Sequence, residues 1–204
     1  MHTQFNEKKS NMKSLLNERA SKTASLLARM CEGTLPVRVE QAIDLLLAPM
    51  RERLPVLVCG NGGSASDAMH IAGELVGRFL RERRACNVIA LSANSTLLTA
   101  WSNDYTFETV FSRQVEAHGQ AGGVLWAIST SGNSTNVIRS IEAARALGMK
   151  TIGMTGEGGG KMATLCDVLL DVPSKETPRI QELHVVLYHF ICEHLEARIV
   201  DNKV

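Results

Sequence analysis

The amino-acid sequence predicts an α/β fold: a doubly wound, parallel five-stranded sheet flanked by helices, with a helical pair at the N-terminus. Two observations predict it. Five short apolar runs follow one another from Pro55 onward, and segments with helical periodicity lie between them. Continuous apolar strands that alternate with helices are typical of parallel sheets buried on both faces. The chain has 204 residues, 45% of them hydrophobic, which is enough apolar material for one core, so we expect a single domain.

The first 53 residues are expected to form two amphipathic helices, over residues 12–31 and from Pro36 onward. Apolar residues recur at helical spacing at Leu15, Leu16, Leu26, Leu27 and Met30 in the first and at Val39, Ile43, Leu46, Leu47 and Met50 in the second. Such a pair, placed ahead of the main fold, is expected to cap the sheet or to pack against a partner chain. We therefore assign residues 1–53 to packing and oligomerisation and residues 54–204 to the α/β core.

Five strands are expected in the core, each bounded by Gly, Asn, Ser or Asp. They are Val56–Cys59, Val88–Leu91, Val124–Ile128, Thr151–Met154 and Val168–Val172. In folds of this kind the ligand binds at the carboxyl ends of the strands, where loops lead into helices. The loops that follow the strands are therefore the places to look for function.

The charge balance argues against a nucleic-acid partner. The net charge is near +1, whereas binding to phosphate backbones usually shows as a basic patch or a high pI. A short cluster of Arg81, Arg83 and Arg84 is interrupted by Glu82, and we interpret it as a solvated helix end.

The cysteines and the N-terminus predict a soluble cytoplasmic protein with no membrane partner. The five cysteines are odd in number and lack CxxC spacing, which is typical of buried free thiols in a reducing compartment: Cys31, Cys59, Cys86, Cys166 and Cys192. The N-terminus has no apolar stretch of the signal-peptide kind, and no run approaches the roughly 18 apolar residues of a spanning helix.

Two loops rich in Gly, Ser and Asn follow the first and third predicted strands, at Gly60–Ser64 and Ser129–Ser134. Glycines let the backbone approach a ligand closely, and the N–H groups that open the following helix attract an anion. Neither loop has the Walker A or GxGxxG pattern. The same residues are also ordinary turn and N-cap residues. Two such loops at one edge of a sheet nevertheless favour a phosphate-bearing ligand.

Four side chains on two predicted helices form a candidate metal site. His70 and Glu74 stand four residues apart, so they leave the same face of their helix. Gln181 and His189, eight residues apart in the last helix, are close enough in azimuth to border one cleft. Imidazole and oxygen ligands suit zinc, although Gln is an uncommon one. Taken singly, a histidine of this kind is more often an ordinary helix residue than a ligand, so spacing alone leaves the metal site open.

Several stretches of the sequence resemble the phosphoheptose isomerases, a family with the SIS (sugar isomerase) fold, over nearly the whole chain. They are GNGGSASDAMHIAGELVGRF, SNDYTFETVFSRQVEA, ISTSGNSTNVI, TGEGGGKMA and TPRIQELHVVLYH. The resemblance implies an aldose–ketose isomerase that converts sedoheptulose 7-phosphate to D-glycero-D-manno-heptose 7-phosphate through an enediol, a step toward lipopolysaccharide. It also implies one zinc ion per subunit and a homotetramer with active sites at the subunit interfaces.

Carried over by position, the resemblance implies a full set of site residues. The zinc ligands would be His70, Glu74, Gln181 and His189, with Glu74 and His189 also acting as the catalytic base and acid. The substrate-binding residues would be Asn61, Gly62, Gly63, Ser64, Glu74, Arg78, Asn103, Asp104, Ser129, Thr130, Ser131, Ser134 and Gln181. Arg78 would reach a neighbouring subunit's site. His184 is expected to be structural. Trp101 stands where smaller residues are common in the family, and Trp126 lies inside the third predicted strand. Each is either a core aromatic or a residue that trims the pocket and so bears on substrate preference.

Other readings belong to different classes of protein. A non-enzymatic relative binds the bacterial replication initiator, but it lacks the helix glutamate and the final histidine that this chain has at Glu74 and His189. A sugar-binding regulator of the SIS type usually carries a DNA-binding module, for which the N-terminal helices leave no room. An isomerase of another phosphosugar remains the third alternative.

Overall fold

The five apolar runs form one parallel sheet in the computed structural model, which describes residues 2–201, with side chains from Asn11 onward. The strands are β1 (Val56–Cys59), β2 (Val88–Ala90), β3 (Val124–Ser129), β4 (Lys150–Thr155) and β5 (Val168–Asp171). Each predicted strand is present, and the ends differ from the prediction by at most one residue. At one such end, the N–H of Leu91 still donates to the carbonyl of Val58, although the ladder is counted as ending at Ala90.

The strand order is β2-β1-β3-β4-β5, and every neighbouring pair is parallel. The chain therefore moves outward from β1 to β2 and then crosses back to place β3 on the other side of β1. Loops that leave β1 and β3 diverge at this point, which is where parallel α/β sheets bind ligands. The two predicted anion loops follow these two strands.

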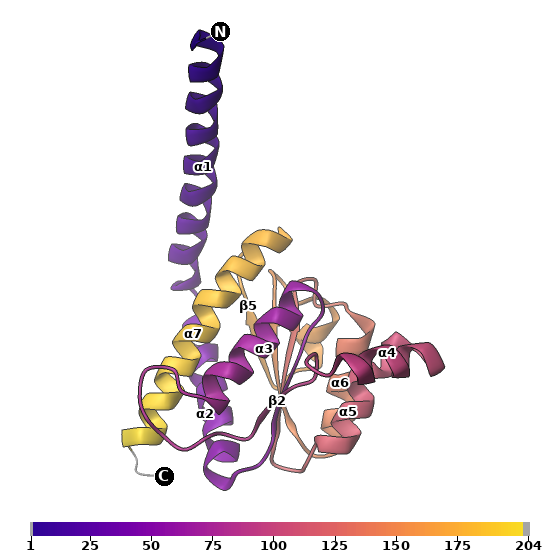
Figure 1. Ribbon diagram of the computed structural model, residues 1–204. Helices are drawn as coiled ribbons and strands as arrows, with labels where there is room; N and C mark the ends of the chain where they lie inside the picture. The colour runs from indigo at the N-terminus through magenta and orange to yellow at the C-terminus, as the bar shows by residue number, and fades with distance from the viewer. Residues whose placement is uncertain (1, 202–204) are drawn as a thin grey trace.

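Helices cover both faces of the sheet (Figure 1). On one face lie α2 (Leu35–Glu52), α3 (Gly63–Val76) and α7 (Thr177–Asp201); on the other lie α4 (Ser95–Asp104), α5 (Val110–His118) and α6 (Thr135–Ala146). Two short 3-10 turns, Phe107–Thr109 and Gly160–Thr164, complete the elements. Alternate strand residues point to opposite faces. Trp126 of β3 therefore lies in the core under α2, α3 and α7, while Leu125 lies under α5 and α6.

Helix α1 (His2–Met30) extends away from the rest of the chain, as Figure 1 shows. Leu26 and Met30, near its end, join the core, as the apolar pattern predicts. Leu15 and Leu16 do not: they are exposed, because the helix has left the body of the protein at that level. This half of α1 therefore does not cap the sheet, and its packing against a partner chain stays a prediction.

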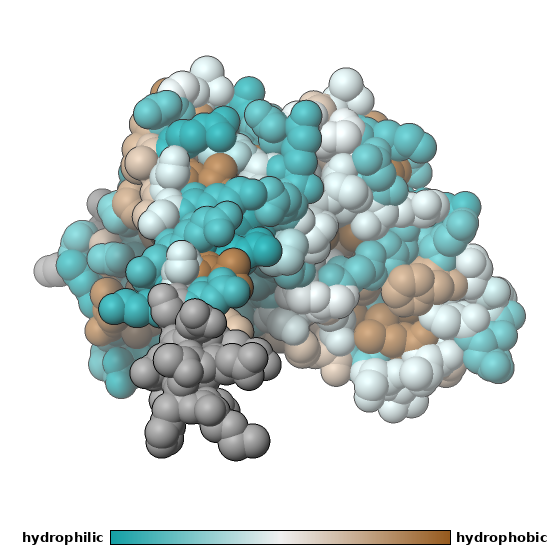
Figure 2. Space-filling view, turned by 90° about the horizontal axis from the view of Figure 1, so that it is seen from above, coloured by the Kyte–Doolittle hydropathy of each residue, from teal (hydrophilic) through white to brown (hydrophobic). Residues whose placement is uncertain are grey.

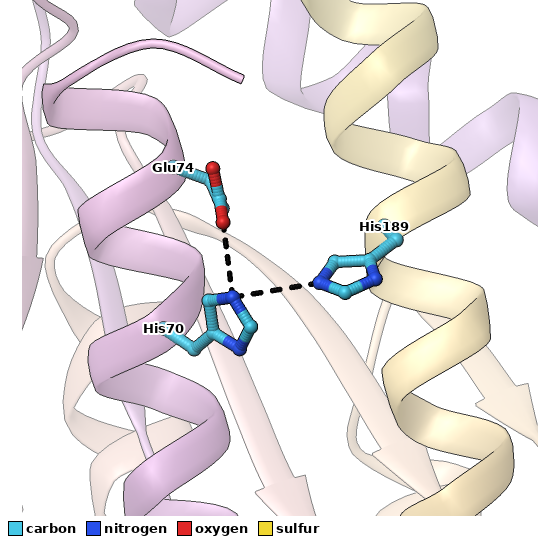
Figure 3. A group of neighbouring side chains, drawn as sticks. All are labelled: His70, Glu74 and His189. Carbon is cyan, nitrogen blue, oxygen red and sulfur yellow. Dashed lines mark hydrogen bonds and ion pairs between the residues drawn. The ribbon is translucent and has the colours of Figure 1, made fainter. Parts of the chain in front are cut away.

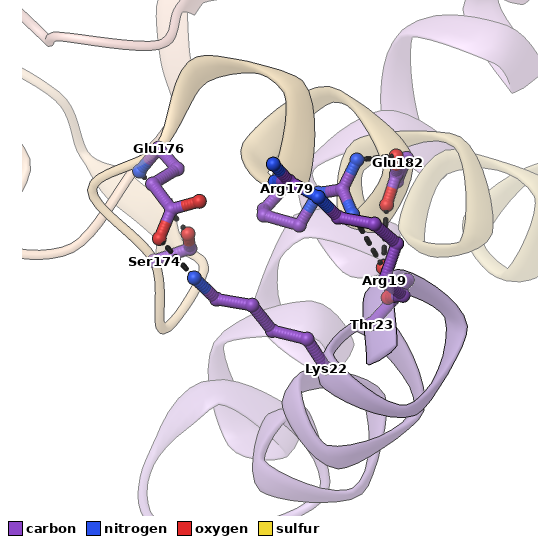
Figure 4. A network of polar contacts seen from close by, with 7 residues as sticks. All are labelled: Arg19, Lys22, Thr23, Ser174, Glu176, Arg179 and Glu182. Atoms are coloured by element: carbon purple, nitrogen blue, oxygen red, sulfur yellow. Dashed lines mark hydrogen bonds and ion pairs between the residues drawn. The ribbon is translucent and has the colours of Figure 1, made fainter. Parts of the chain in front are cut away.

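A polar network ties the last turns of α1 to the beginning of α7 (Figure 4). The hydroxyl of Thr23 donates to Glu182 at 2.7 Å, and Arg179 donates both to Thr23, at 3.3 Å, and to Glu182. Lys22 forms an ion pair with Glu176 just before α7 begins. These contacts hold the start of α7 in place, and that start borders the cavity described below.

The arginine cluster after α3 is not a solvated helix end. The helix ends at Val76, so Arg81, Arg83 and Arg84 lie in the segment that leads to β2. The side chain of Arg83 is only 2% exposed, and Arg84 donates to the carbonyl of Met50 at 2.9 Å. The prediction of a solvated cluster is thus wrong for Arg83, because buried backbone carbonyls and a buried carboxylate surround it.

The face in Figure 2 is mainly hydrophilic, with apolar residues in small separate patches. All five cysteines are free; Cys59, Cys86 and Cys192 are buried as expected, Cys166 is half-buried, and Cys31 is exposed. None of the helices in the described part of the chain combines the length and apolarity that crossing a bilayer would require.

Candidate functional site

A cavity of about 290 Å³ opens at the carboxyl ends of β1 and β3. Its lining joins the two predicted anion loops to the first turns of α7: Asn61, Gly62, Gly63, Ser64, Ile128, Ser129, Thr130, Ser134, Thr177 and Gln181. Apart from Ile128 and Thr177, every one of these residues is in the predicted set. The structure therefore brings the loops together where the strand order changes direction.

Two helix N-termini meet at this cavity. Helix α3 begins at Gly63 and α6 begins at Thr135, directly after Ser134. Both helix starts carry the positive end of the helix dipole. In α3 the N–H groups of Ser64 and Ala65 donate to the carbonyls of Asn61 and Gly62, so the dipole rather than these N–H groups attracts an anion there. The hydroxyl groups of Ser129 and Ser134 lie 2.9 Å apart and add further donors. The arrangement suits a phosphate, because hydroxyl donors and helix N-termini can bind one even though the cavity lining contains no lysine or arginine.

Two glycines allow contacts beside the cavity that a side chain would block. A Cβ at Gly63 would lie 2.2 Å from Nε2 of Gln181, so the amide of α7 rests directly on the start of α3. Gly132 has a positive φ of 65°, and a Cβ there would lie 2.0 Å from the carbonyl oxygen of Gly159. The glycine-rich segment after β4 thereby supports the loop after β3.

The two anion loops are joined directly by a pair of side-chain amides. Asn61 donates to Asn136 at 2.8 Å, and Asn136 donates back to Asn61 at 2.9 Å. Asn136 is buried and also accepts from the N–H of Val137. The side chain of Asn61 therefore links the loop after β1 to α6, and its amide keeps one further N–H for a ligand.

A second cluster, the His70 group, consists of His70, Glu74 and His189 and lies farther along α3 and α7 (Figure 3). His70 and Glu74 of α3 and His189 of α7 bring their ligand atoms within 4.8 Å of one another. Nε2 of His70 lies 2.9 Å from the Glu74 carboxylate and 3.5 Å from Nε2 of His189. Three of the four predicted zinc ligands thus converge from two different helices.

Neighbouring groups fix the orientation of these rings. The hydroxyl of Tyr188 lies 2.8 Å from Nδ1 of His70, which leaves Nε2 directed at Glu74 and His189. Burial lowers the pKa of His189, and the charge of His70 lowers it further, while Glu74 opposes the shift. His189 is therefore biased toward the neutral form that can accept a proton. Nearby, burial raises the pKa of Asp67 to about 6.

The donor set fits zinc. Two imidazoles and a carboxylate are common zinc ligands, and a tetrahedral ion with bonds of about 2.1 Å separates its ligand atoms by about 3.4 Å. The nitrogen–nitrogen distance of 3.5 Å between His70 and His189 matches that spacing. Gln181 lies against Gly63, eight residues and about 12 Å along the helix axis from His189. To become the fourth ligand, Gln181 would have to move its side chain away from Gly63 and toward His70, Glu74 and His189.

Some predicted residues lie outside both groups. Asn103 and Asp104 end helix α4, where they are exposed and Asn103 donates to Asp104. Arg78 is exposed and pairs with Glu82 at 3.0 Å. Ser131 lies in the predicted anion loop after β3, where its hydroxyl accepts from the N–H of Asn133. Within one chain these positions are not part of the cavity lining.

His184 and the tryptophans have structural surroundings. His184 is fully buried, and Nε2 lies 3.1 Å from the carbonyl oxygen of Thr155, in keeping with the structural role expected of it. Trp126 is a core residue of β3. Trp101 stacks on Tyr105 and donates to the hydroxyl of Thr109 at 2.9 Å. Neither tryptophan lines the cavity.

Two cavity residues, Ile128 and Thr177, were not predicted as site residues. Ile128 was assigned to a strand, and only the strand order shows that its end borders the cavity. Thr177 opens α7 four residues before Gln181, so the two side chains share a helix face. That spacing was the available signal for Thr177.

Comparisons with known proteins agree with this geometry. A family model described as "SIS domain" matches residues 20–156. A phosphoheptose isomerase from Crocosphaera subtropica is 53% identical over 161 residues, which are 79% of this chain and 82% of that protein. The solved phosphoheptose isomerase of Neisseria gonorrhoeae superposes with a TM-score of 0.85 at 39% identity, covering 91% of this chain and 99% of the other. The one from Francisella tularensis gives a TM-score of 0.87 at 32% identity, covering 91% and 98%.

Proposed function

The chain belongs to the phosphoheptose isomerases of the SIS domain family, and from that membership we propose that it interconverts sedoheptulose 7-phosphate and D-glycero-D-manno-heptose 7-phosphate. The reaction is an aldose–ketose isomerisation that supplies heptose for bacterial glycans such as lipopolysaccharide. The observation that carries the proposal is the pairing of a phosphate-binding cavity with a carboxylate and two histidines along the same two helices.

The cavity is proposed to hold the phosphate end of the substrate. Ser64, Ser129 and Ser134, with the N–H groups that open α6, would donate to the phosphate oxygens, and the dipole of α3 would attract them. Glu74 lies ten residues after Ser64, about 15 Å along the helix axis. Its side chain tilts back toward the start of α3, which shortens the span that an extended sugar phosphate must bridge.

Proton transfer is proposed to involve Glu74 and His189. Isomerisation moves a proton from C1 to C2 and another from the C1 oxygen to the C2 oxygen, through an enediol. Glu74 would take the carbon proton and return it to the adjacent carbon. His189, whose pKa is lowered by burial and by His70, would carry the proton between the two oxygens. A positioned acid or base of this kind typically contributes about 10²–10⁴-fold to the rate.

The proposed metal is one zinc ion held by His70, Glu74 and His189, with Gln181 as the fourth ligand. Bound there, zinc would act as a Lewis acid that polarises the substrate carbonyl. A carboxylate that binds a metal is a weaker base. Glu74 has two carboxylate oxygens, however, so one can bind the metal while the other accepts a proton.

We propose a homotetramer in which the sites lie between subunits. Closed symmetric assemblies are the general expectation for soluble oligomers. Apolar side chains are exposed on the same two helices as the His70 group, at Met69, Val76, Val186 and Phe190, and on α1 at Met12, Leu15 and Leu16. Arg78, exposed one turn after Glu74, would then reach a neighbouring subunit's site. A monomer with full activity in sedimentation experiments would contradict this assembly.

One assay tests the activity. Purified protein is incubated with sedoheptulose 7-phosphate before and after treatment with a chelator, and again after zinc is restored. We expect turnover to the aldose, its loss with the chelator, and its return with zinc. No turnover by zinc-loaded protein would overturn the proposed function. Turnover that the chelator leaves unchanged would remove the metal and keep the isomerase.

A further inference from the structure

The segment between α3 and β2 is held by a single carboxylate of α7. The N–H of Phe79 donates to one oxygen of Glu196 at 2.8 Å, and the N–H groups of Leu80 and Arg81 donate to the other at 2.6 and 2.8 Å. The Glu196 side chain is only 1% exposed. Burial alone would raise its pKa, but these three donors and Arg83 lower it, so the group is ionised.

Arg83 connects this carboxylate to the end of α3. Its Nε lies 3.2 Å from Glu196, outside hydrogen-bonding geometry, so the two buried side chains form an ion pair. Its other two nitrogens donate to the carbonyl oxygens of Glu74, at 2.8 Å, and Gly77, at 3.0 Å. Glu74 lies in the last turn of α3 and Gly77 directly follows it, at the helix end where carbonyls lack intrahelical donors and a cation is favoured. Arg83 therefore binds the backbone of the residue proposed as the catalytic base.

The pair lies directly beyond the His70 group. Glu196 follows His189 by seven residues, or nearly two helical turns, so both side chains leave the same face of α7. On α3, His70 and Glu74 face His189, and the helix end just beyond them is bound to Glu196 through Arg83. The two helices are thus joined at successive levels, first by the His70 group and then by the ion pair.

A buried ion pair is a poor means of stabilisation alone, because apolar residues of similar volume often stabilise a fold equally well. The hydrogen bonds that each partner makes to the backbone, Glu196 to residues 79–81 and Arg83 to Glu74 and Gly77, can instead fix a geometry. We propose that Arg83 and Glu196 are positioning residues that set the separation and register of α3 and α7, and thereby keep His70, Glu74 and His189 together. This inference rests on the proposed function, since it assigns the pair a role in that same site.

The test uses two conservative variants and two kinds of control. Glu196→Gln keeps the shape but removes the charge, and Arg83→Lys keeps the charge but removes the planar fork. Glu193→Gln, exposed on the same helix, controls for loss of a charge. Ile141→Val and Ile141→Ala remove methyl groups from the core on the opposite face of the sheet, under α5 and α6. They lower stability by a small and a large amount and so show what a weaker fold alone does to the site.

Two properties are measured on folded protein. The first is zinc affinity by competition with a chromophoric chelator; loss of a partner outside the ligands typically weakens metal binding about 10- to 100-fold. We expect about a tenfold loss in both pair variants and none in the controls. The second, in metal-free protein, is the NMR cross-relaxation between the rings of His70 and His189, whose centroids are 5.0 Å apart. We expect it to weaken in the pair variants alone.

The outcomes separate this inference from the proposed function. Unchanged zinc affinity and unchanged ring contact in both pair variants would overturn the positioning role. Equal losses in the Ile141 variants at matched stability would also overturn it, because the effect would then be general. If the wild type binds no zinc and turns over no sugar phosphate, the proposed function fails, and the ring contact still decides whether the pair positions the helices.

Discussion

Asn61 and Asn136 donate to each other's side-chain oxygens, at 2.8 and 2.9 Å, across the gap between β1 and α6. The pair joins the loop after β1 to the start of α6, and both border or support the cavity. Asn61 therefore helps to hold the cavity's shape. Its amide keeps a second N–H, so the substrate-binding role that the family resemblance implies stays a prediction.

Asn136→Ala is expected to raise KM for sugar phosphate about tenfold with a smaller effect on kcat, because the loops lose their connection at a cost of about 1–1.5 kcal/mol per hydrogen bond. Steady-state kinetics test this. The double variant with Asn61→Ala should be little worse than either single variant, since both break the same pair. Asn87→Ala, exposed at the opposite end of the strands, is the control. Additive effects of the two variants would show that they act separately.

Glu74→Gln is expected to slow proton abstraction by at least ~10²-fold, because the amide keeps the volume but has no basic oxygen. The measurement is exchange of the C1 proton of the substrate with solvent, followed by NMR. Ligand-induced thermal shift on the same variant should be retained, since Ser64, Ser129 and Ser134 do not depend on the carboxylate. Glu142→Gln, exposed on α6, is the matched control. Wild-type exchange in Glu74→Gln would clear this residue of the role.

His70→Ala is expected to lose most of the bound zinc, because it removes the ligand whose Nε2 lies between Glu74 and His189. Elemental analysis should find up to about one zinc per chain in the wild type. Added zinc should raise the melting temperature of the wild type and not of the variant, because the ion binds only the folded state. His118→Ala, at the end of α5, should behave like the wild type. Equal zinc in all three proteins would remove the metal site.

His184→Gln is expected to flatten the pH dependence of stability between pH 6.5 and 4. Burial lowers the pKa of His184 from 6.5 to about 4. As the pH falls through this window, the unfolded chain takes up a proton that the folded chain refuses, so the wild type loses stability. The loss amounts to about 3 kcal/mol at about 1.4 kcal/mol per pKa unit. Urea unfolding of both proteins at pH 7.5, 6, 5 and 4 measures it, and identical pH dependences of the free energy of unfolding would contradict the prediction.

The sheet and the cavity could be predicted because their signals are local. Each strand is a continuous apolar run, and each anion loop follows a strand directly in sequence. The convergence of His70 with Glu74 likewise follows from helical spacing. His189 joins them only through the packing of α3 against α7, which periodicity does not specify, and the family resemblance supplied that link.

Other features escaped prediction because they depend on contacts distant in sequence. Arg83 was interpreted as solvated, since a short charged cluster gives no sign of a carboxylate 113 residues later in the chain. The exposed Leu15 and Leu16 have the same spacing as buried helix residues, and only the path of α1 separates the two cases. The pairing of Asn61 with Asn136 was hidden because both are also ordinary loop and cap residues.

Helix α7 carries Gln181 at the cavity, His189 in the His70 group and Glu196 in the buried ion pair. A single residue inserted between these positions would turn everything beyond it by about 100° and move it by about 1.5 Å. A length change within residues 181–196 would therefore separate the three groups. Among relatives that keep the reaction, insertions and deletions should spare the stretch from Gln181 to Glu196.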